Sequence, residues 1–432
     1  MAIDKRFPKE EVEDKFCTVM KNVIVYNDFA HPFGGAGVVA LGSAVALAKR
    51  GYNVTFFSGT GPESPLLAKN NVKSICLNQP DILSESNKIK AAYRGIWNQK
   101  AYNRTLELLR DCDDNDTVIL VHGFAKTLSS SIFAAFKRTN FKVMVFLHDY
   151  FTACPNGGFF NYQSHCNCNL KPISIECLLS NCDVRSYSQK LYRYVRQFMI
   201  RHNIKGNNMH LYAYNVSDLS GKLLEPYVKE YFSTYKTFFN PVGVHTGDYV
   251  DISKNTYYIY IGRLSEEKGI REFCHALTEL KLNGIVLGDG YLMNEMKNSY
   301  PNIKFAGWVN GEEKVELILK SKCLVFPSKV HETFGLAVTE MLSYGIPCIV
   351  PDGCGCTPFV ENGKNGFVYS MGDYEKLKEC IAKFEALNIN DIMEVTRSSF
   401  NREYFSQENY VVRLEEEINR LFSQQTIYNN IQ

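Results

Sequence analysis

The sequence predicts an α/β protein built from two Rossmann-like domains. Its 432 residues are too many for one compact core, and two domains of roughly 200 residues each are the natural division. In each half, short apolar runs alternate with helical stretches, as in a parallel sheet covered by helices on both faces. A hydrophobic content of 45% with 22% charged residues is typical of an ordinary globular enzyme.

The first half opens with a βαβ unit at residues 21–59. An apolar strand leads through the glycine-rich segment "HPFGGAG" into a helix of small residues, and a second apolar strand follows. Further apolar runs at residues 117–123, 142–150 and 209–217 continue the alternation. We assign residues 1–245 to an N-terminal Rossmann-like domain.

A polar segment with Pro and Gly, residues 237–255, is predicted to link the two domains. After it the alternation of strands and helices restarts, so we assign residues 246–405 to a second Rossmann-like domain. Residues 406–432 have apolar side chains at helical spacing with charged residues between them. They predict an amphipathic helix that packs back on the N-terminal domain.

The charge balance excludes some function classes. A formal net charge of +2 does not indicate a nucleic-acid-binding protein. Residues 1–16 are charged throughout and lack an apolar core, and no later apolar run approaches the ~20 residues that span a bilayer. The sequence therefore predicts a cytoplasmic protein.

Polar residues and glycines follow three strands of the second domain. Since the carboxyl ends of parallel strands meet at one edge of a sheet, we expect these residues to line a ligand site. They are Gly262, Arg263, Lys268, Gly288, Asp289, Gly290, Glu332, Phe334, Gly335 and Leu336. Arg263 and Lys268 place two cations where a diphosphate could bind, although a solvated pair on a loop is the alternative.

Glu332 and Glu340 stand on either side of a predicted helix start at Phe334, Gly335 and Leu336. The free N–H groups and dipole of a helix N-terminus bind an anion, and glycine lets a phosphate approach the backbone. Glu340 lies about 12 Å further along, so each carboxylate can accept hydrogen bonds from a sugar on its own side of the anion. The arrangement outlines a nucleoside-diphosphate sugar, with a salt-bridging role as the alternative for Glu340.

The segments "GRLSEEKG", "GDG", "PSKVHETFGLAVTEMLSYGIPCIV" and "VENGKNGFVYS" resemble the C-terminal half of retaining glycosyltransferases of family 4, the glycosyl transferases group 1, which have the GT-B fold. "HPFGGAG" resembles the family's N-terminal glycine loop, and the last helix resembles its cross-over helix. The resemblance covers most of residues 21–423 and is strongest in the second domain. It implies two domains facing across a cleft.

The same resemblance implies an activity. It is metal-independent hexosyl transfer, with retention, from a UDP- or GDP-sugar to a glycan or a lipid-diphosphate-linked acceptor in cell-surface polysaccharide biosynthesis. The transition state is oxocarbenium-like, and cations with the helix N-terminus neutralise the departing diphosphate. No carboxylate nucleophile and no catalytic cofactor are expected.

The resemblance also implies roles for residues. Arg263 and Lys268 hold the diphosphate and stabilise the leaving group, Glu332 contacts the transferred sugar, and Glu340 contacts the ribose. His122 matches a histidine that faces the donor sugar, with His148 as a nearby alternative; for either, a structural histidine at a strand end stays open. The full donor-binding set is Gly34, Gly35, Gly262, Arg263, Lys268, Gly288, Gly290, Glu332, Phe334, Gly335, Leu336 and Glu340.

The sequence departs from the family after the last long apolar strand. Where many relatives have a glycine pair and Pro-Glu, this chain has "PDGCGCTPFVENG". Cys354 and Cys356 are therefore expected near the donor pocket, and Glu361 comes later than in relatives. This departure leaves open which sugar the donor carries.

Five of the 14 cysteines cluster in an insertion at about residues 152–184. Four of them are enough for a structural zinc site that would staple a loop lacking its own core. The spacing is not a standard CxxC pair, so reduced cysteines or a stress-labile disulfide are the alternatives. The candidates are Cys154, Cys166, Cys168, Cys177 and Cys182, with His165 beside them.

Residues 185–205 contain no acidic residue and interleave Arg and Lys with aromatic and aliphatic side chains. This pattern predicts a basic amphipathic helix that contacts an anionic membrane or a lipid-diphosphate acceptor. A surface helix balanced by acids elsewhere is the alternative. RNA binding has no supporting motif.

Two other function classes stay open. One is a non-catalytic, glycosyltransferase-like scaffold, against which the intact Arg263, Lys268, Glu332 and Glu340 argue. The other is a sugar-nucleotide epimerase or a phosphorylase on the same fold. A phosphorylase needs a lysine that holds pyridoxal phosphate, and the sequence offers no context for one.

Overall fold

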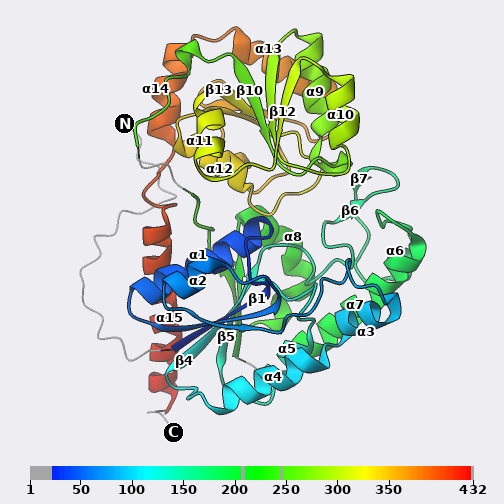
Figure 1. The fold of residues 1–432 in the computed structure, drawn as a ribbon, viewed down its shortest axis with the longest axis vertical. Helices are drawn as coiled ribbons and strands as arrows, with labels where there is room; N and C mark the ends of the chain where they lie inside the picture. The colour runs from blue at the N-terminus through cyan, green and yellow to red at the C-terminus, as the bar shows by residue number, and fades with distance from the viewer. Residues whose placement is uncertain (1–21, 206–209, 244–246, 430–432) are drawn as a thin grey trace. The chain divides into compact units, whose positions relative to one another are not determined.

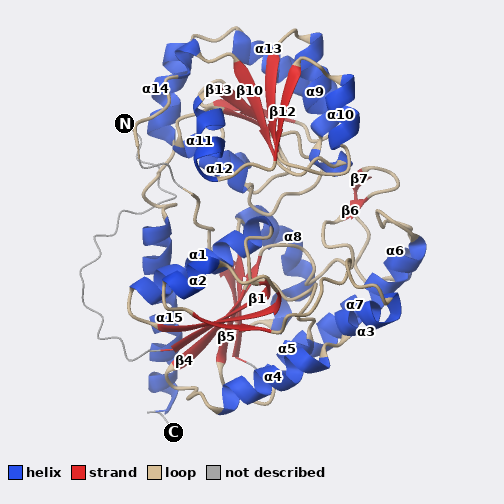
Figure 2. Ribbon diagram, viewed as in Figure 1, coloured by secondary structure: helices blue, strands red, loops and turns tan. Residues whose placement is uncertain are grey.

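The computed structural model describes residues 22–205, 210–243 and 247–429 (Figure 1). The prediction made for residues 1–16 lies outside these ranges. Two parallel sheets, each with helices around it, make up the described chain (Figure 2). The predicted α/β class with two Rossmann-like domains is therefore confirmed.

The first sheet has seven strands in the order β3-β2-β1-β4-β5-β8-β9. Its central strands consist almost entirely of buried apolar residues, as expected where helices cover both faces. The register aligns Val23 of β1 with Val54 of β2 and Val118 of β4. The strands are β1 Asn22–Phe29, β2 Asn53–Thr60, β3 Lys73–Cys76, β4 Thr117–Val121, β5 Lys142–Leu147, β8 His210–Asn215 and β9 Thr234–Thr237.

Several of the helices between these strands begin at a residue whose side chain caps the first turn. Ser186, for example, accepts a hydrogen bond from the backbone N–H of Gln189 at the start of α7. A two-stranded hairpin, β6 Phe160–Asn161 with β7 Cys166–Asn167, lies in the cysteine-rich insertion. The helices are α1 Gly34–Lys49, α2 Pro65–Lys69, α3 Lys88–Ile96, α4 Gln99–Arg110, α5 Ser131–Phe136, α6 Ile175–Leu179, α7 Tyr187–Ile204 and α8 Asp218–Val228.

The second sheet has six strands in the order β12-β11-β10-β13-β14-β15. They are β10 Tyr257–Ile261, β11 Asn283–Leu287, β12 Ile303–Gly307, β13 Ser321–Val325, β14 Cys348–Pro351 and β15 Gly366–Tyr369. The chain adds strands on one side of β10 and then reverses to add β13 on the other. This is the strand order of a dinucleotide-binding Rossmann fold.

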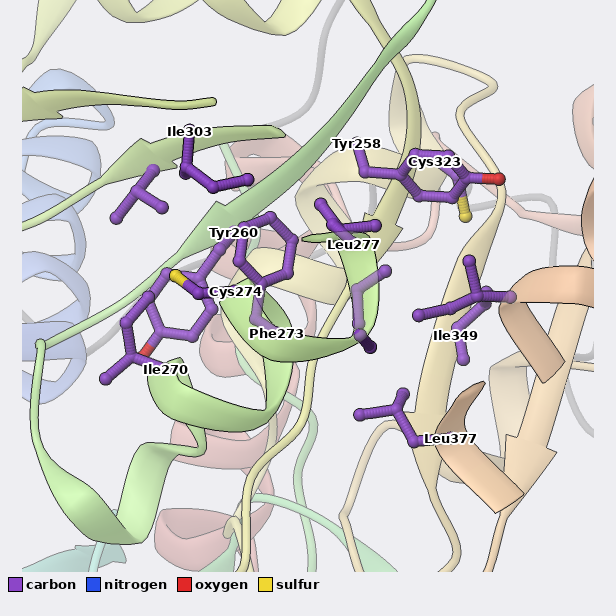
Figure 3. Close-up of a cluster of buried hydrophobic side chains, with 14 of the residues drawn as sticks. Tyr258, Tyr260, Ile270, Phe273, Cys274, Leu277, Ile303, Cys323, Ile349 and Leu377 are labelled. Atoms are coloured by element: carbon purple, nitrogen blue, oxygen red, sulfur yellow. The ribbon is translucent and has the colours of Figure 1, made fainter. Parts of the chain in front are cut away.

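Helices lie on both sides of the second sheet (Figure 2). They are α9 Ile270–Glu279, α10 Met293–Ser299, α11 Gly311–Leu319, α12 Leu336–Ser343, α13 Tyr374–Glu385 and α14 Ile389–Ser399. Between the sheet and α9, the rings of Tyr260 and Phe273 pack with Leu277 in a buried cluster (Figure 3). Burial of this apolar surface stabilises the sheet and holds the ends of its strands in place.

Every cysteine in the described ranges is a free thiol. Several belong to the apolar core of the second sheet, including Cys274 and Cys323 (Figure 3). Burial raises the pKa of the Cys274 thiol to about 12. Such thiols behave as small hydrophobic side chains and are chemically inert.

Contacts group the chain into two compact units. Of the described residues, the first unit comprises 22–146, 210–212 and 403–429, and the second comprises 147–205, 213–243 and 247–402. Among the described residues, no helix is both long enough and apolar enough to cross a lipid bilayer.

Within the first unit, the last helix, α15 Gln407–Asn429, packs against α1. The small residues of α1 allow a close approach: a Cβ on Gly42 would lie 2.9 Å from Oε1 of Gln407. The Ser43 hydroxyl donates to the Tyr410 hydroxyl at 3.4 Å. Next to α1, Arg50 pairs with Glu415 at 2.5 Å.

Candidate functional site

The site forms where the order of the second sheet reverses, between β10 and β13. Loops that follow neighbouring strands at such a point run in opposite directions and leave a crevice at the carboxyl edge. Here these loops are residues 262–269 and 326–335. Both belong to the second unit.

Local contacts hold the two loops together. The hydroxyl of Tyr260 donates to the carbonyl oxygen of Arg263 at 2.8 Å and shapes the turn after β10. Gly269 ends this turn at φ +71°, and a Cβ there would lie 1.9 Å from the carbonyl oxygen of Pro327. Only glycine fits both the backbone conformation and the contact.

Lys268 and Glu332 meet across these loops. The ammonium of Lys268 donates a hydrogen bond to Oε1 of Glu332, and the Ser328 hydroxyl donates to the same oxygen at 2.8 Å. Both charged side chains are partly exposed, at 25% for Lys268 and 16% for Glu332. The pair is therefore preorganised and can still reach a ligand.

Arg263 lies in the same turn as Lys268 but has a different partner. One of its terminal nitrogens pairs with the buried carboxylate of Glu267 at 2.5 Å. The Arg263 side chain is otherwise 63% exposed. One edge of the guanidinium is thus anchored while the rest can contact an anion.

Helix α12 begins at Leu336, as the sequence predicts, with Gly335 before it at φ +90°. The first hydrogen bond within this turn runs from Val338 N–H to the Gly335 carbonyl at 3.0 Å. The N–H groups of Leu336 and Ala337 precede that bond, at the positive end of the helix. They are suited to an anionic ligand.

Glu340 lies about one turn into α12 and is part of an ion pair. The ammonium of Lys314, on α11, donates to both carboxylate oxygens, at 2.6 and 2.7 Å. Glu340 is thus in a salt bridge, which is the alternative role that the sequence left open. A role in ribose binding requires that Glu340 share its carboxylate between Lys314 and the ligand.

Gly288 and Gly290 have a packing role that the sequence did not reveal. A Cβ on Gly288 would lie 1.9 Å from the carbonyl oxygen of Gly262, and one on Gly290 would lie 2.2 Å from that of Leu264. The loop after β11 thus packs directly against the turn that carries Arg263. Asp289 is exposed and accepts a hydrogen bond from Gly290 N–H at 2.7 Å.

Cys354 and Cys356 lie in the loop after β14, which packs against the loop that carries Glu332: the N–H of Gly355 donates to the Glu332 carbonyl oxygen at 2.8 Å. Both thiols are buried, and burial raises the pKa of Cys354 well above its usual value. A Cβ on Gly335 would lie 2.6 Å from the Cys356 sulfur, so this thiol supports the start of α12. Glu361, by contrast, is exposed and pairs with Lys364 at 2.8 Å.

The remaining sequence-predicted residues belong to the ends of first-sheet strands. Gly34 begins α1 at φ +68°, with Gly35 next to it. His122 follows β4 and is buried, and its ring stacks on Phe146 at 4.6 Å between centroids. His148 follows β5, where burial lowers its pKa to about 3, so the ring is neutral near pH 7.

The predicted zinc site is not assembled in the structure. Within the described ranges, no group of three or more His, Cys, Asp or Glu side chains is placed to hold a metal ion. Cys166 is exposed on the β6–β7 hairpin, as is the neighbouring His165, while Cys154 is buried and Cys168 is half-buried. Cys177 and Cys182 instead accept hydrogen bonds from the ammonium of Lys190.

Residues 185–205 comprise α7 and three flanking residues, but much of the basic charge points inward. Lys190 and Arg196 are buried, and Arg193 pairs with the buried Asp183 at 3.0 Å. The exposed face of α7 carries apolar side chains, namely Leu191, Val195 and Phe198.

Comparison with known proteins identifies the domain that holds these loops. Residues 249–399 match the family model of the glycosyl transferases group 1. They form a group 1 glycosyltransferase domain. All of the site residues from Gly262 to Glu340 lie in it.

The group 1 domain has curated relatives at low identity. The chain is 27% identical over 135 residues to sulfoquinovosyl transferase SQD2 of Arabidopsis thaliana, covering 30% of this chain and 26% of the relative. It is 27% identical over 124 residues to a GDP-mannose-dependent alpha-mannosyltransferase of Mycobacterium tuberculosis, covering 28% and 32%. The chain thus spans only about a quarter to a third of the length of these relatives.

Solved structures share the fold over nearly the whole chain. Sucrose-phosphate synthase from Thermosynechococcus elongatus has a TM-score of 0.65 at 14% identity, covering 94% of this chain and 100% of that one. Anabaena HepE in complex with UDP has a TM-score of 0.62 at 15% identity, covering 93% and 100%. These matches support the GT-B fold for the group 1 domain together with its partner domain.

Proposed function

We propose that the chain is a retaining glycosyltransferase of family 4 that moves a sugar from a nucleoside-diphosphate sugar to a glycan or lipid-linked acceptor, in cell-surface polysaccharide biosynthesis. The observation that carries the proposal is the Lys268–Glu332 pair beside the N-terminus of α12 in a group 1 domain. Relatives bear the names GDP-mannose-dependent alpha-mannosyltransferase and, in Escherichia coli, UDP-Gal:alpha-D-GlcNAc-diphosphoundecaprenol alpha-1,3-galactosyltransferase. These names favour a GDP- or UDP-sugar donor.

The donor diphosphate binds at the start of α12. The N–H groups of Leu336 and Ala337 would bind it there together with the cations of Lys268 and Arg263. When the diphosphate arrives, Lys268 turns part of its hydrogen bonding from Glu332 to phosphate oxygens. The carboxylate of Glu332, still held by Ser328, can then accept hydrogen bonds from the sugar hydroxyls.

The same groups stabilise the transition state. As the bond to the sugar breaks, negative charge develops on the diphosphate, and two cations and a helix dipole aimed at it lower the barrier. These cations do what a bound divalent metal does at other diphosphate sites, so the proposed reaction is metal-independent. Glu332 contacts the transferred sugar without acting as a nucleophile, and His122, or alternatively His148, faces it.

The acceptor is assigned to the N-terminal domain. A hollow of about 590 Å³ lies at the carboxyl ends of β1, β2 and β3 in the first unit. The stacked rings of Phe29 and Phe33, 4.3 Å apart, form part of its wall, beside Asn78 and Gln79. Aromatic faces with amide groups suit the apolar and hydroxyl-bearing faces of a sugar.

A peripheral membrane contact through α7 belongs to the same proposal, with the protein in the cytoplasm. The exposed Leu191, Val195 and Phe198 would enter the interface, and the exposed Arg185 and Lys205 would meet anionic headgroups. Because Lys190 and Arg196 point inward, apolar insertion contributes more to this contact than charge.

The test is an assay of the purified full-length chain with UDP-, GDP-, ADP- and dTDP-sugars and a panel of glycan and undecaprenyl-diphosphate acceptors. Transfer of the sugar with its anomeric configuration retained supports the proposal. Donor binding without transfer to any acceptor would favour a scaffold, and isomerisation of the donor itself would favour an epimerase.

A further inference from the structure

The hydroxyl of Tyr150 is buried and has no hydrogen-bond partner in the described part of the chain. Tyr150 follows β5 and is 2% exposed. Its ring packs edge to face on Phe159, with 5.1 Å between the centroids. A buried hydroxyl without a partner lowers the stability of the folded protein. A change that gives this hydroxyl a partner therefore stabilises the state in which the change occurs.

The loop that carries Tyr150 packs against the loop that carries Glu332. Two residues before Tyr150, the carbonyl oxygen of His148 accepts a hydrogen bond from the Thr333 hydroxyl at 2.8 Å. Thr333 is the neighbour of Glu332 in the sequence, and all four residues belong to the second unit. Burial, followed by the negative charge of Glu332, raises the pKa of Tyr150 well above its usual value. The charge of Glu332 thus acts on a hydroxyl that keeps its proton and can donate a hydrogen bond.

The Glu332 carboxylate has both of its donors on one oxygen. Lys268 and Ser328 donate to Oε1, and Oε2 has no donor among the described residues. In the proposed function, Lys268 turns from Glu332 towards the diphosphate. The carboxylate then loses a charged partner, although its side chain is only 16% exposed. A carboxylate in such a place is destabilised unless another donor replaces the lysine.

We propose that Tyr150 is a positioning residue for Glu332, because its hydroxyl donates to that carboxylate once Lys268 has moved to the diphosphate of the nucleotide sugar. This inference rests on the proposed function. The exchange of one donor for another keeps Glu332 in place to accept hydrogen bonds from the transferred sugar. The hydroxyl is unpaired in the free protein and paired in the complex, so Tyr150 favours the complex over the free protein.

The experiment compares the full-length parent with Tyr150→Phe and Tyr258→Phe, each of which removes only a hydroxyl group. Tyr258 is the matched control, because it is equally buried but its hydroxyl donates to Glu385 at 2.5 Å. Without ligand, Tyr150→Phe should be at least as stable as the parent in denaturant unfolding, whereas Tyr258→Phe should be less stable. Calorimetry with the UDP-, GDP-, ADP- or dTDP-sugar that the parent binds should show about tenfold weaker binding by Tyr150→Phe and unchanged binding by Tyr258→Phe.

Two further measurements separate positioning from a purely structural role. In a Glu332→Gln background, the loss of affinity from Tyr150→Phe should shrink to about threefold or less, because a neutral amide accepts a weaker hydrogen bond than a carboxylate. Where transfer is measured, KM for the nucleotide sugar should rise more than kcat falls, because the new hydrogen bond forms on binding and persists in the transition state.

Three results would overturn the inference and leave the proposed function standing. One is a loss of stability in ligand-free Tyr150→Phe, since the hydroxyl would then have a structural partner. Another is donor affinity in Tyr150→Phe equal to that of the parent. The third is an equally large loss of affinity with and without the Glu332 carboxylate. A parent protein that binds none of the four nucleotide sugars would instead overturn the proposed function, and this inference with it.

Discussion

Lys268 and Glu332 form an ion pair that joins the loop after β10 to the loop after β13, and Ser328 donates to the same carboxylate oxygen. The pair lies beside the N-terminus of α12, where a helix dipole favours an anion. A diphosphate therefore meets a site whose two ligand-facing charges already hold one another in place.

Glu332→Gln should abolish most sugar transfer and leave nucleotide binding nearly unchanged. The amide keeps the shape of the side chain but loses the charge-assisted hydrogen bonds that the sugar would receive. We expect kcat to fall at least about 100-fold, with the Kd of the nucleoside diphosphate within about threefold of the parent. Steady-state kinetics and calorimetry check this. Unchanged kcat would remove Glu332 from the site.

Glu340 and Lys314 should behave as one unit. Glu340→Gln removes the carboxylate assigned to the ribose, and we expect nucleotide affinity to fall about tenfold, as for the loss of one charged hydrogen bond. Lys314→Met leaves Glu340 without its partner and should also lower the affinity for the nucleotide. Because the two side chains are in contact, the double variant should lose less than the two single changes combined. Strict additivity would show that the two side chains act on nucleotide affinity independently of each other, which would contradict this prediction.

Gly335→Ala should destabilise the protein and weaken donor binding. The alanine would have to adopt φ +90° and place its Cβ 2.6 Å from the Cys356 sulfur. Gly363→Ala is the matched control, because that residue also has a positive φ, +72°, but no heavy atom lies within 4 Å of its Cβ position. We expect about 1 kcal/mol of destabilisation in the control and about 1–3 kcal/mol more at Gly335. Equal losses in denaturant unfolding would contradict this.

His148 should make the fold less stable as the pH falls. Burial lowers its pKa to about 3, whereas in the unfolded chain it titrates near 6.5. Between these two values the unfolded state binds a proton that the folded state does not, so stability decreases as pH falls from about 6.5 towards 3. From pH 7.5 to 5.5 the contribution reaches about 1.4 kcal/mol. His148→Gln should flatten that part of the unfolding profile, and an unchanged slope would refute the assignment.

The fold followed from the sequence because the central strands are apolar runs and most of the connections between them are helices of compatible length. The start of α12 at Leu336 was also predictable, since Gly335 before a run of helix formers is a local signal. Ser328 could also have been suspected, because a serine four positions before Glu332 in the same loop is near enough to donate to its carboxylate.

Other features of the site depend on tertiary contacts that local sequence does not encode. Lys314 lies 26 positions before Glu340 on a different helix, so nothing nearby indicates their ion pair. Gly288 and Gly290 suggested ligand binding, but their small size is needed where the loop meets Gly262 and Leu264. The inward turn of Lys190 was hidden because its basic neighbours made α7 look like a uniformly charged surface helix.

The most direct test of the account measures nucleotide binding by the parent, by Lys268→Met and by Lys320→Met. Lys320 is the control, since it pairs with Glu316 on the exposed side of α11. We predict that one class among the UDP-, GDP-, ADP- and dTDP-sugars, at about 100 times its Kd, stabilises the parent and the control by about 2.7 kcal/mol and does not stabilise Lys268→Met. Stabilisation of Lys268→Met equal to that of the parent, or of none of the three proteins by any of these donors, would contradict the donor site at the Lys268–Glu332 pair.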